Sequence, residues 1–302
     1  TKFIGPDLFT DSFIDTLSQF EETDNFGSLI QPKIKETQEI SEILKSKDLS
    51  GQLFLNATHE KVLRVLKQAD YLSPKYHVVV ANPPYMGIKG MNQELSTWAK
   101  ENYPDSKSDL FAMFMERTLK LTVKGGFMGM INQHAWMFLP SYEKLRKKIL
   151  KSHMIDTMAH LGTRAFDSIG GEVVQVTAFT LIKSLVTKRI GIYFRLVSYK
   201  SSDEKDQEFF NLKNRYEAKQ ENFVKIPGNS LVYWASSQIR SAFLGKSIGD
   251  ITISDGQTKT GDNDKYLRFV WEVDYTNIGK NEKWVKHPKG GNFRKWHGNL
   301  NR

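Results

Sequence analysis

The sequence predicts an α/β protein in which helices connect the strands of one sheet. Three observations favour this fold class: a short β-branched run at 76–81 (YHVVVA), helical patterns on both sides of it, and further strand patterns after the second helix. Strands that alternate with helices are typical of sheets with crossover connections. A chain of 302 residues is long enough for one large domain, or for one domain and part of a second.

The first predicted elements surround the run at 76–81. The helix before it has apolar residues at i, i+3, i+4 and i+7, namely Val62, Val65, Leu66 and Ala69. The run itself is typical of a buried strand. A second helix is expected to begin after Asp109, a favoured N-cap residue, and to end at Lys124-Gly125-Gly126. The segment FMGMIN then predicts the next strand, with its methionines in the core.

The remaining strands are predicted between residues 140 and 200. A basic helix is expected at 141–151 and a strand at 154–159, followed by two longer strands at 173–182 and 190–196. Because only a short turn separates the last two strands, we expect them to form an antiparallel hairpin at the end of the sheet.

The sequence changes character after residue 200. Residues 201–207 are polar and charged, and helices are expected at 206–222 and 236–245. Beyond Gly249 the chain is rich in Gly, Asn, Asp and Thr, with β-like pieces such as YLRFVWEV. We therefore expect a domain boundary near 245–249.

The composition excludes several functional classes. Without cysteine the chain forms neither disulfides nor thiolate metal sites, and its seven histidines lack HxH and HxxxH spacing, so no metal is expected. No apolar run approaches the roughly 20 residues that span a bilayer. The first residues do not resemble a signal peptide. A cytoplasmic protein without a membrane contact is expected.

The net charge of +9 is concentrated near the end of the sequence. Residues 280–302 hold seven Lys and Arg residues against Glu282, a local charge of +6, together with Trp284, Phe293 and Trp296. Basic residues interleaved with aromatic residues suit the phosphates and exposed bases of nucleic acid. A solvated tail explains the same composition equally well.

The residues with the clearest chemistry are Asn82, Pro83, Pro84 and Tyr85, directly after the strand at 76–81. Enzymes with α/β folds bind their ligands at the carboxyl ends of strands. An exocyclic amino nitrogen is a poor nucleophile, because its lone pair is delocalised. Two acceptors that bind its hydrogens orient that lone pair toward an electrophilic methyl group.

The loop can provide both acceptors. They are the Asn82 side-chain carbonyl and the Pro83 backbone carbonyl, which the prolines hold in a fixed geometry. Tyr85 offers a flat face for a base swung out of a duplex. The alternative is that Pro-Pro only ends the strand and that Tyr85 packs in a turn. We interpret His134 and Trp136 as packing residues at a strand end, with a direct catalytic role as the minor alternative.

Residues 77–139 resemble the adenine-specific DNA methyltransferases that use an NPPY loop, most closely the PglX-type enzymes of BREX phage-exclusion systems. The matching segments are VVVANPPYMG, SDLFAMFMERTLKLTVKGGFMGMINQHAWMFL, LGTRAFDSIGGEVVQVTAFTLIK, and QTKTGDN followed later by GGNFRKWHGN. The resemblance implies that 1–200 is the catalytic-loop half of a Rossmann-like methyltransferase sheet, its C-terminal part. A helical connector (201–246) and the start of a mixed α+β target-recognition region (247–302) would follow.

The resemblance also implies roles for single residues. The loop Asn82–Tyr85 would transfer a methyl group from S-adenosylmethionine to the 6-amino group of a flipped-out adenine, with Phe166 contacting the base beside Tyr85. The cofactor would lie near Asp109, Leu110 and Phe111. Contacts to double-stranded DNA would come from Lys259, Arg294, Lys295 and Trp296.

The main S-adenosylmethionine motif of that family is absent. The 81 residues before Asn82 contain only Gly5, Gly27 and Gly51, without a Gly-rich turn, and the later cluster at 125–129 precedes a strand and does not open a helix. We expect the chain to be a fragment that binds the cofactor weakly or not at all and is inactive alone.

Two alternatives stay open. RNA or a protein glutamine could be the methyl acceptor, although the connector and recognition region after residue 200 argues against glutamine, as does the basic stretch at 280–302. The other alternative is a DNA-binding and partner-docking module that works with other proteins of a phage-defence system.

Overall fold

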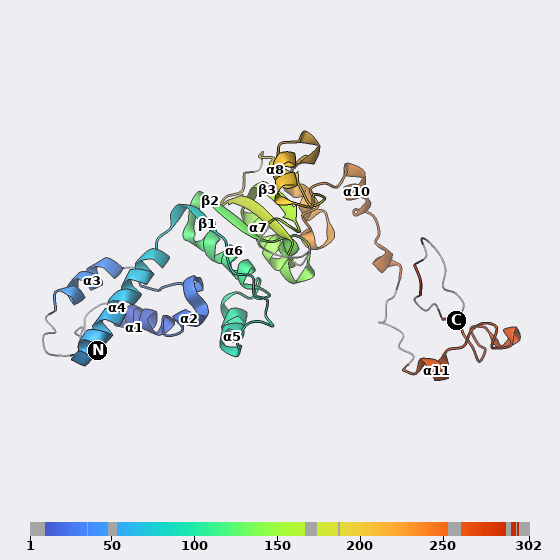
Figure 1. Ribbon diagram of the computed structural model, residues 1–302, viewed down its shortest axis with the longest axis horizontal. Coiled ribbons are helices and arrows are strands. Elements are labelled where there is room, and N and C mark those ends of the chain that lie inside the picture. Colours follow the sequence, from blue (N-terminus) through green and yellow to red (C-terminus); the bar gives the residue numbers. More distant parts are fainter. Residues whose placement is uncertain are drawn as a thin grey trace. The chain divides into compact units, whose positions relative to one another are not determined.

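The computed structural model of the chain describes residues 10–34, 36–47, 53–166, 174–186, 188–252, 261–287, 291–293 and 295 (Figure 1). The chain divides into two compact units, 1–245 and 246–302. No helix in the described ranges is long and apolar enough to cross a membrane.

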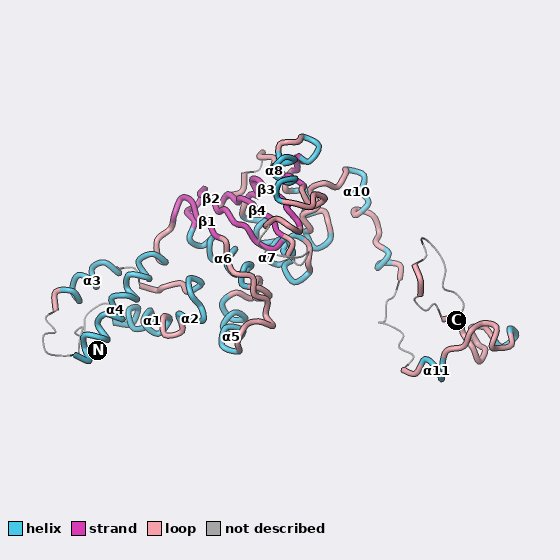
Figure 2. Tube along the Cα trace, in the orientation of Figure 1, coloured by secondary structure: helices cyan, strands magenta, loops and turns pink. Residues whose placement is uncertain are grey.

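One mixed sheet forms the centre of the first unit (Figure 2). Its strands are β1 (Tyr76–Ala81), β2 (Thr122–Gln133), β3 (Met154–Gly162), β4 (Val176–Ile182), β5 (Gly191–Arg195) and β6 (Arg215–Ala218). Their order in the sheet is β1-β2-β4-β3-β5-β6. The pairings give β1, β2, β3 and β5 one direction, whereas β4 and β6 run the opposite way. The predicted α/β class is confirmed.

The expected hairpin between the strands now labelled β4 and β5 is wrong, because β3 lies between them. Neighbouring strands are about 4.8 Å apart, so a connection that passes one strand has to cover only about 10 Å. The segment 183–190 is long enough for that. A short connection therefore does not require its two strands to pair, and apolar alternation does not identify a strand's neighbours.

The helices are α1 (Thr10–Gln19), α2 (Thr23–Phe26), α3 (Thr37–Lys45), α4 (Leu53–Leu72), α5 (Gln93–Asn102), α6 (Leu110–Leu121), α7 (Glu143–Ser152), α8 (Ser202–Phe209), α9 (Glu221–Val224), α10 (Ser237–Ala242) and α11 (Asn263–Tyr266). The predicted helices α4, α6 and α7 are confirmed. α1, α3 and α4 share a small core of their own around Phe13, Ile40 and Leu66. α6 ends at Leu121 and β2 begins at Thr122, slightly before the expected glycines.

The main core lies on one face of the sheet. Phe111 and Met115 of α6 and Leu145 of α7 pack there against Met130 of β2 and Phe179 of β4. The methionines expected in the core, Met128 and Met130, are buried, and so are Met113 and Met115 of α6. This face therefore carries the apolar packing that fixes α6 against β1 and β2.

The edge strand β1 is exposed along its other face. Val78 and Val80 are 61% and 77% exposed, and Phe127 of β2 beside them is 42% exposed. β1 pairs only with β2 among the described strands. Large apolar side chains at such exposure mark a surface that normally has a cover.

Two expectations after residue 200 are corrected. The continuous helix at 206–222 is replaced by α8, the strand β6 and the short α9, so the segment 201–246 is not wholly helical. Arg215–Ala218 pairs with β5 because its alternating exposed and half-buried residues suit a sheet edge. In the second unit, 266–273 forms no β-structure: Tyr266 ends α11, and 267–273 is irregular with a turn and bends. The described residues there contain one isolated bridge, Ile278 with Trp284.

Candidate active site

The loop Asn82–Tyr85 leaves the sheet at the carboxyl end of β1. Ala81, the last residue of β1, pairs with Met130 of β2. Asn82 and Pro84 are exposed, Pro83 is buried and Tyr85 is half-buried. No described residue forms a hydrogen bond with the Asn82 side chain. Its amide therefore faces outward with its carbonyl available.

Asp109 fixes the far end of this loop. Its Oδ1 accepts hydrogen bonds from the backbone N–H groups of Met86 (3.0 Å) and Phe111 (3.2 Å). The Leu110 N–H donates to the Met86 carbonyl at 3.1 Å, which ties the loop to the first turn of α6 a second time. Asp is among the best N-cap residues, so the helix start and the loop anchor use one side chain. The predicted N-cap is confirmed.

The anchoring carboxylate is buried. Burial raises the pKa of Asp109 above its ordinary value, although the backbone N–H groups that it binds act in the opposite direction. These hydrogen bonds hold the carboxylate in place.

Tyr85 rests on an aromatic support. Its ring contacts Phe111 edge to face, with centroids 6.1 Å apart, and Phe111 contacts Tyr142 at 5.6 Å. Phe111 is fully buried. Burial, and then the charge of Asp109, raise the pKa of the Tyr85 phenol, so the ring stays neutral. A half-exposed neutral ring with a rigid support is suited to stacking.

The three residues expected near the cofactor lie behind the loop. Leu110 packs into a cluster with Met91 and Leu95, and Phe111 belongs to the main core. Asp109 is occupied by the loop. Their observed contacts are structural, and their expected cofactor role stays a prediction.

Phe166 lies beyond the carboxyl end of β3 and is half-buried. Because β1 and β3 run in the same direction, Phe166 and Asn82 follow their strands at the same edge of the sheet. Two strands, β2 and β4, separate them. Residues 167–173, which follow Phe166, lie outside the described ranges.

A histidine pair at the same edge was not foreseen. His134, directly after β2, has its Nδ1 2.7 Å from Nε2 of His160 in β3, and Nδ1 of His160 is 3.1 Å from the Tyr233 hydroxyl. Burial lowers the pKa of His160 to about 3, with smaller contributions from His134 and Arg195. Burial also lowers the pKa of His134. Both rings are therefore neutral. The sequence signal was a polar residue, His160, on the apolar side of a strand.

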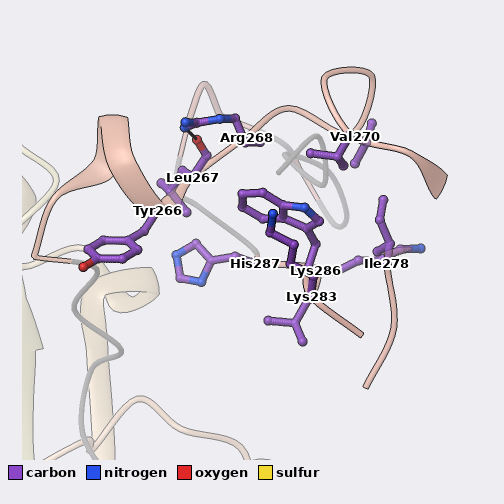
Figure 3. Close-up of a pocket in the computed structure, with 11 residues that line it drawn as sticks. Tyr266, Leu267, Arg268, Val270, Ile278, Lys283, Lys286 and His287 are labelled. Carbon is purple, nitrogen blue, oxygen red and sulfur yellow. Dashed lines mark hydrogen bonds between the residues drawn. The ribbon is translucent and has the colours of Figure 1, made fainter. Parts of the chain in front are cut away.

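The second unit contains a cavity of about 290 Å³ (Figure 3). Leu267, Val270 and Ile278 line it together with Trp284, and basic side chains surround them: Arg268, Lys283, Lys286 and His287. The Lys283 ammonium lies over the Trp284 ring at 5.7 Å. Of the expected DNA contacts, Lys295 is exposed, whereas Lys259, Arg294 and Trp296 lie outside the described residues.

The sheet and its helices define the chain as an α/β protein, and its sequence matches a methylase family. Residues 11–166, more than half of the chain, match the family described as Eco57I restriction-modification methylase. The chain belongs to this family. The resemblance noted in the sequence is confirmed.

Two curated relatives match nearly the whole chain. The adenine-specific methyltransferase PglX of Lacticaseibacillus casei (strain Zhang) is 38% identical over 98% of this chain and 26% of its own length. The adenine-specific methyltransferase BrxX of Escherichia coli O9:H4 (strain HS) is 38% identical over 94% of this chain and 24% of its own length. The chain thus spans about a quarter of each relative.

Among solved structures, the cryoEM structure of a DrdV–DNA complex is similar to this chain. The similarity covers 59% of this chain and 20% of the solved chain. The sequence identity is 14% and the TM-score is 0.43.

Proposed function

We propose that the chain is the catalytic-loop part of an adenine-specific DNA methyltransferase of a phage-defence or restriction-modification system. The reaction is the transfer of a methyl group from S-adenosylmethionine to the 6-amino group of a flipped-out adenine. The observation that carries the proposal is the exposed Asn82 amide beside Tyr85, on a loop anchored by Asp109. The 38% identity to two adenine-specific methyltransferases supports it.

The chemistry assigned to the loop is binding and orientation of the amino group. The Asn82 side-chain carbonyl and the Pro83 backbone carbonyl accept its two hydrogens, which directs the lone pair away from the loop. The described contacts of this loop leave the Asn82 carbonyl available for that purpose. Tyr85 stacks on the base, because its ring is supported by Phe111. Anchoring at Met86 limits loop movement, so the acceptors are preorganised.

The described residues fit S-adenosylmethionine only in part. Leu110 and Phe111 are buried in apolar clusters, and Asp109 is bound to the loop. They form no Gly-rich cradle for the charged end of the cofactor. The edge of β1, which pairs only with β2 among the described strands, supports the further proposal that this sheet is the C-terminal part of a larger Rossmann-like sheet, which supplies that cradle.

The partner that the second unit favours is double-stranded DNA. In the proposed organisation, 201–246 connects the sheet to a target-recognition region at 247–302. Basic residues beside aromatic residues, such as Lys283 over Trp284, suit phosphates and bases. Other proteins of a phage-defence system are proposed as further partners.

Asn82→Ala in the full-length protein tests the proposal. Methyl transfer to DNA should be abolished while salt-sensitive DNA binding stays largely intact, because Asn82 acts on the amino group and not on phosphates. Asn102→Ala, an exposed asparagine at the end of α5, is the matched control and should leave transfer unchanged. Transfer that survives Asn82→Ala would refute the proposed role of the loop.

A further inference from the structure

His134, His160 and Tyr233 form a hydrogen-bonded chain at the carboxyl edge of the sheet. They come from three segments: the end of β2, the strand β3 and the segment after α9. His160 is only 3% exposed, whereas His134 is half-buried at the rim. The methyl transfer proposed above does not involve any of these three residues.

The two distances fit two sets of tautomers, and only the set in which the Tyr233 hydroxyl donates gives its hydrogen an acceptor among the described residues. The acceptor that the described residues offer to the Tyr233 hydroxyl is Nδ1 of His160. A neutral His160 then carries its hydrogen on Nε2 and donates it to Nδ1 of His134. His134 consequently carries its own hydrogen on Nε2.

The Nε2–H of His134 is an oriented donor without a partner among the described residues. The atom forms no hydrogen bond with them, it is not among the fully buried polar atoms that lack a partner, and its ring is half-buried at the rim. The ring cannot turn freely, because Phe138 contacts it edge to face at 5.6 Å and His160 holds Nδ1.

The position of this donor links it to the catalytic loop. In the order β1-β2-β4-β3, His134 follows β2 and therefore lies between Asn82, which follows β1, and Phe166, which comes after β3. It is also on the same face as Tyr85. Tyr85 and Phe138 both pack against the core cluster that contains Tyr233.

We propose that His134 is a base-binding residue that donates a hydrogen bond from Nε2 to a ring nitrogen of the target base. The inference rests on the proposed adenine methylation. The three ring nitrogens of adenine that do not carry the sugar, N1, N3 and N7, are all acceptors, whereas guanine carries a donor at N1. A neutral fixed donor suits such an acceptor, and it lacks the charge that favours phosphate.

The test couples changes in the protein with changes in the base. The full-length protein methylates duplexes whose target position holds adenine, 1-deazaadenine, 3-deazaadenine or 7-deazaadenine, and kcat/KM is measured for each. The variant is His134→Phe, which keeps a ring and removes the donor. His153→Phe is the matched control, since His153 is a half-buried histidine at the opposite edge, just before β3.

One analogue should reduce kcat/KM of the unchanged protein roughly tenfold, and His134→Phe should reduce it by a similar factor on adenine. For His134→Phe, kcat/KM should not fall further when adenine is replaced by that analogue, because the hydrogen bond is already lost. His134→Gln, whose amide donates from a nearby position, should recover part of the activity on adenine. His153→Phe should keep the full sensitivity.

The inference would be overturned if the loss from His134→Phe and the loss from the analogue multiplied for each of the three analogues. A His134→Phe protein with unchanged kcat/KM would also overturn it. Comparison of thermal melting for His134→Phe and His134→Gln separates misfolding from loss of the donor. If the unchanged protein methylates no adenine, the proposed function itself fails, which is a different result from an active enzyme indifferent to His134.

Discussion

Replacing Asp109 by alanine and by asparagine separates its role as an acceptor from its role as a charge. In Asp109→Ala the backbone N–H groups of Met86 and Phe111 lose the carboxylate that now lies 3.0 and 3.2 Å away. Each hydrogen bond to a charged acceptor contributes about 1.5–3 kcal/mol, and water replaces part of it near a loop. We expect the free energy of unfolding to fall by about 2–4 kcal/mol.

Asp109→Asn should cost less than about 1 kcal/mol. Asparagine keeps the Oδ1 acceptor and is an equally good N-cap. It also removes the desolvation cost that raises the pKa of the buried carboxyl, which offsets its weaker hydrogen bonds. Activity should follow the same order, because the anchor positions the loop that carries Asn82. A misplacement of about 1 Å can cost about 100-fold in rate.

Urea denaturation of the full-length protein measures the stability difference, and kcat and KM for the methyl donor measure the activity. The expected result is a small loss in both for asparagine and a large loss for alanine. Equal losses in activity for the two variants, with asparagine stable, would refute this reasoning. They would indicate that the charge contacts the cofactor, which is the role that the resemblance implies.

Two further predictions concern the buried polar groups. Because the pKa of His160 is about 3 when folded and about 6.5 when unfolded, the unfolded chain binds the extra proton between these values. The free energy of unfolding should therefore fall as the pH drops from about 6.5 toward 3, by up to about 1.4 kcal/mol per unit. Urea titrations at pH 7 and 5 should show this slope reduced in His160→Gln, and an equal slope would contradict the assignment. Arg146 is buried and donates hydrogen bonds to three main-chain carbonyls. Arg146→Met should lower the free energy of unfolding by about 3–5 kcal/mol. Lys147→Met, at an exposed position, should change it by no more than about 0.5 kcal/mol.

The parts of the molecule that the sequence predicts are those with strong local signals. The β-branched run of β1, the Asp109 cap and the apolar periodicity of α6 all depend on neighbours within a few residues. The location of the candidate site is predictable for the same reason, because the loop at Asn82 lies between two such elements.

The order of the strands depends on contacts that are distant in the sequence. β3 separates β4 from β5, which no local pattern indicates. The contact between His160 and Tyr233 joins residues 73 positions apart. β6 was missed because its four residues, Arg215–Ala218, have little periodicity to recognise.

The most direct test of the account is methyl transfer from labelled S-adenosylmethionine by the full-length protein. Duplex DNA, RNA and a protein extract are offered in parallel, first alone and then with partner proteins, and Asn82→Ala is the control. The account predicts label on DNA adenine that disappears in Asn82→Ala. Label on RNA or on protein glutamine, or no label on any substrate even with partners, would contradict it. The last result would favour a DNA-binding module of a defence complex.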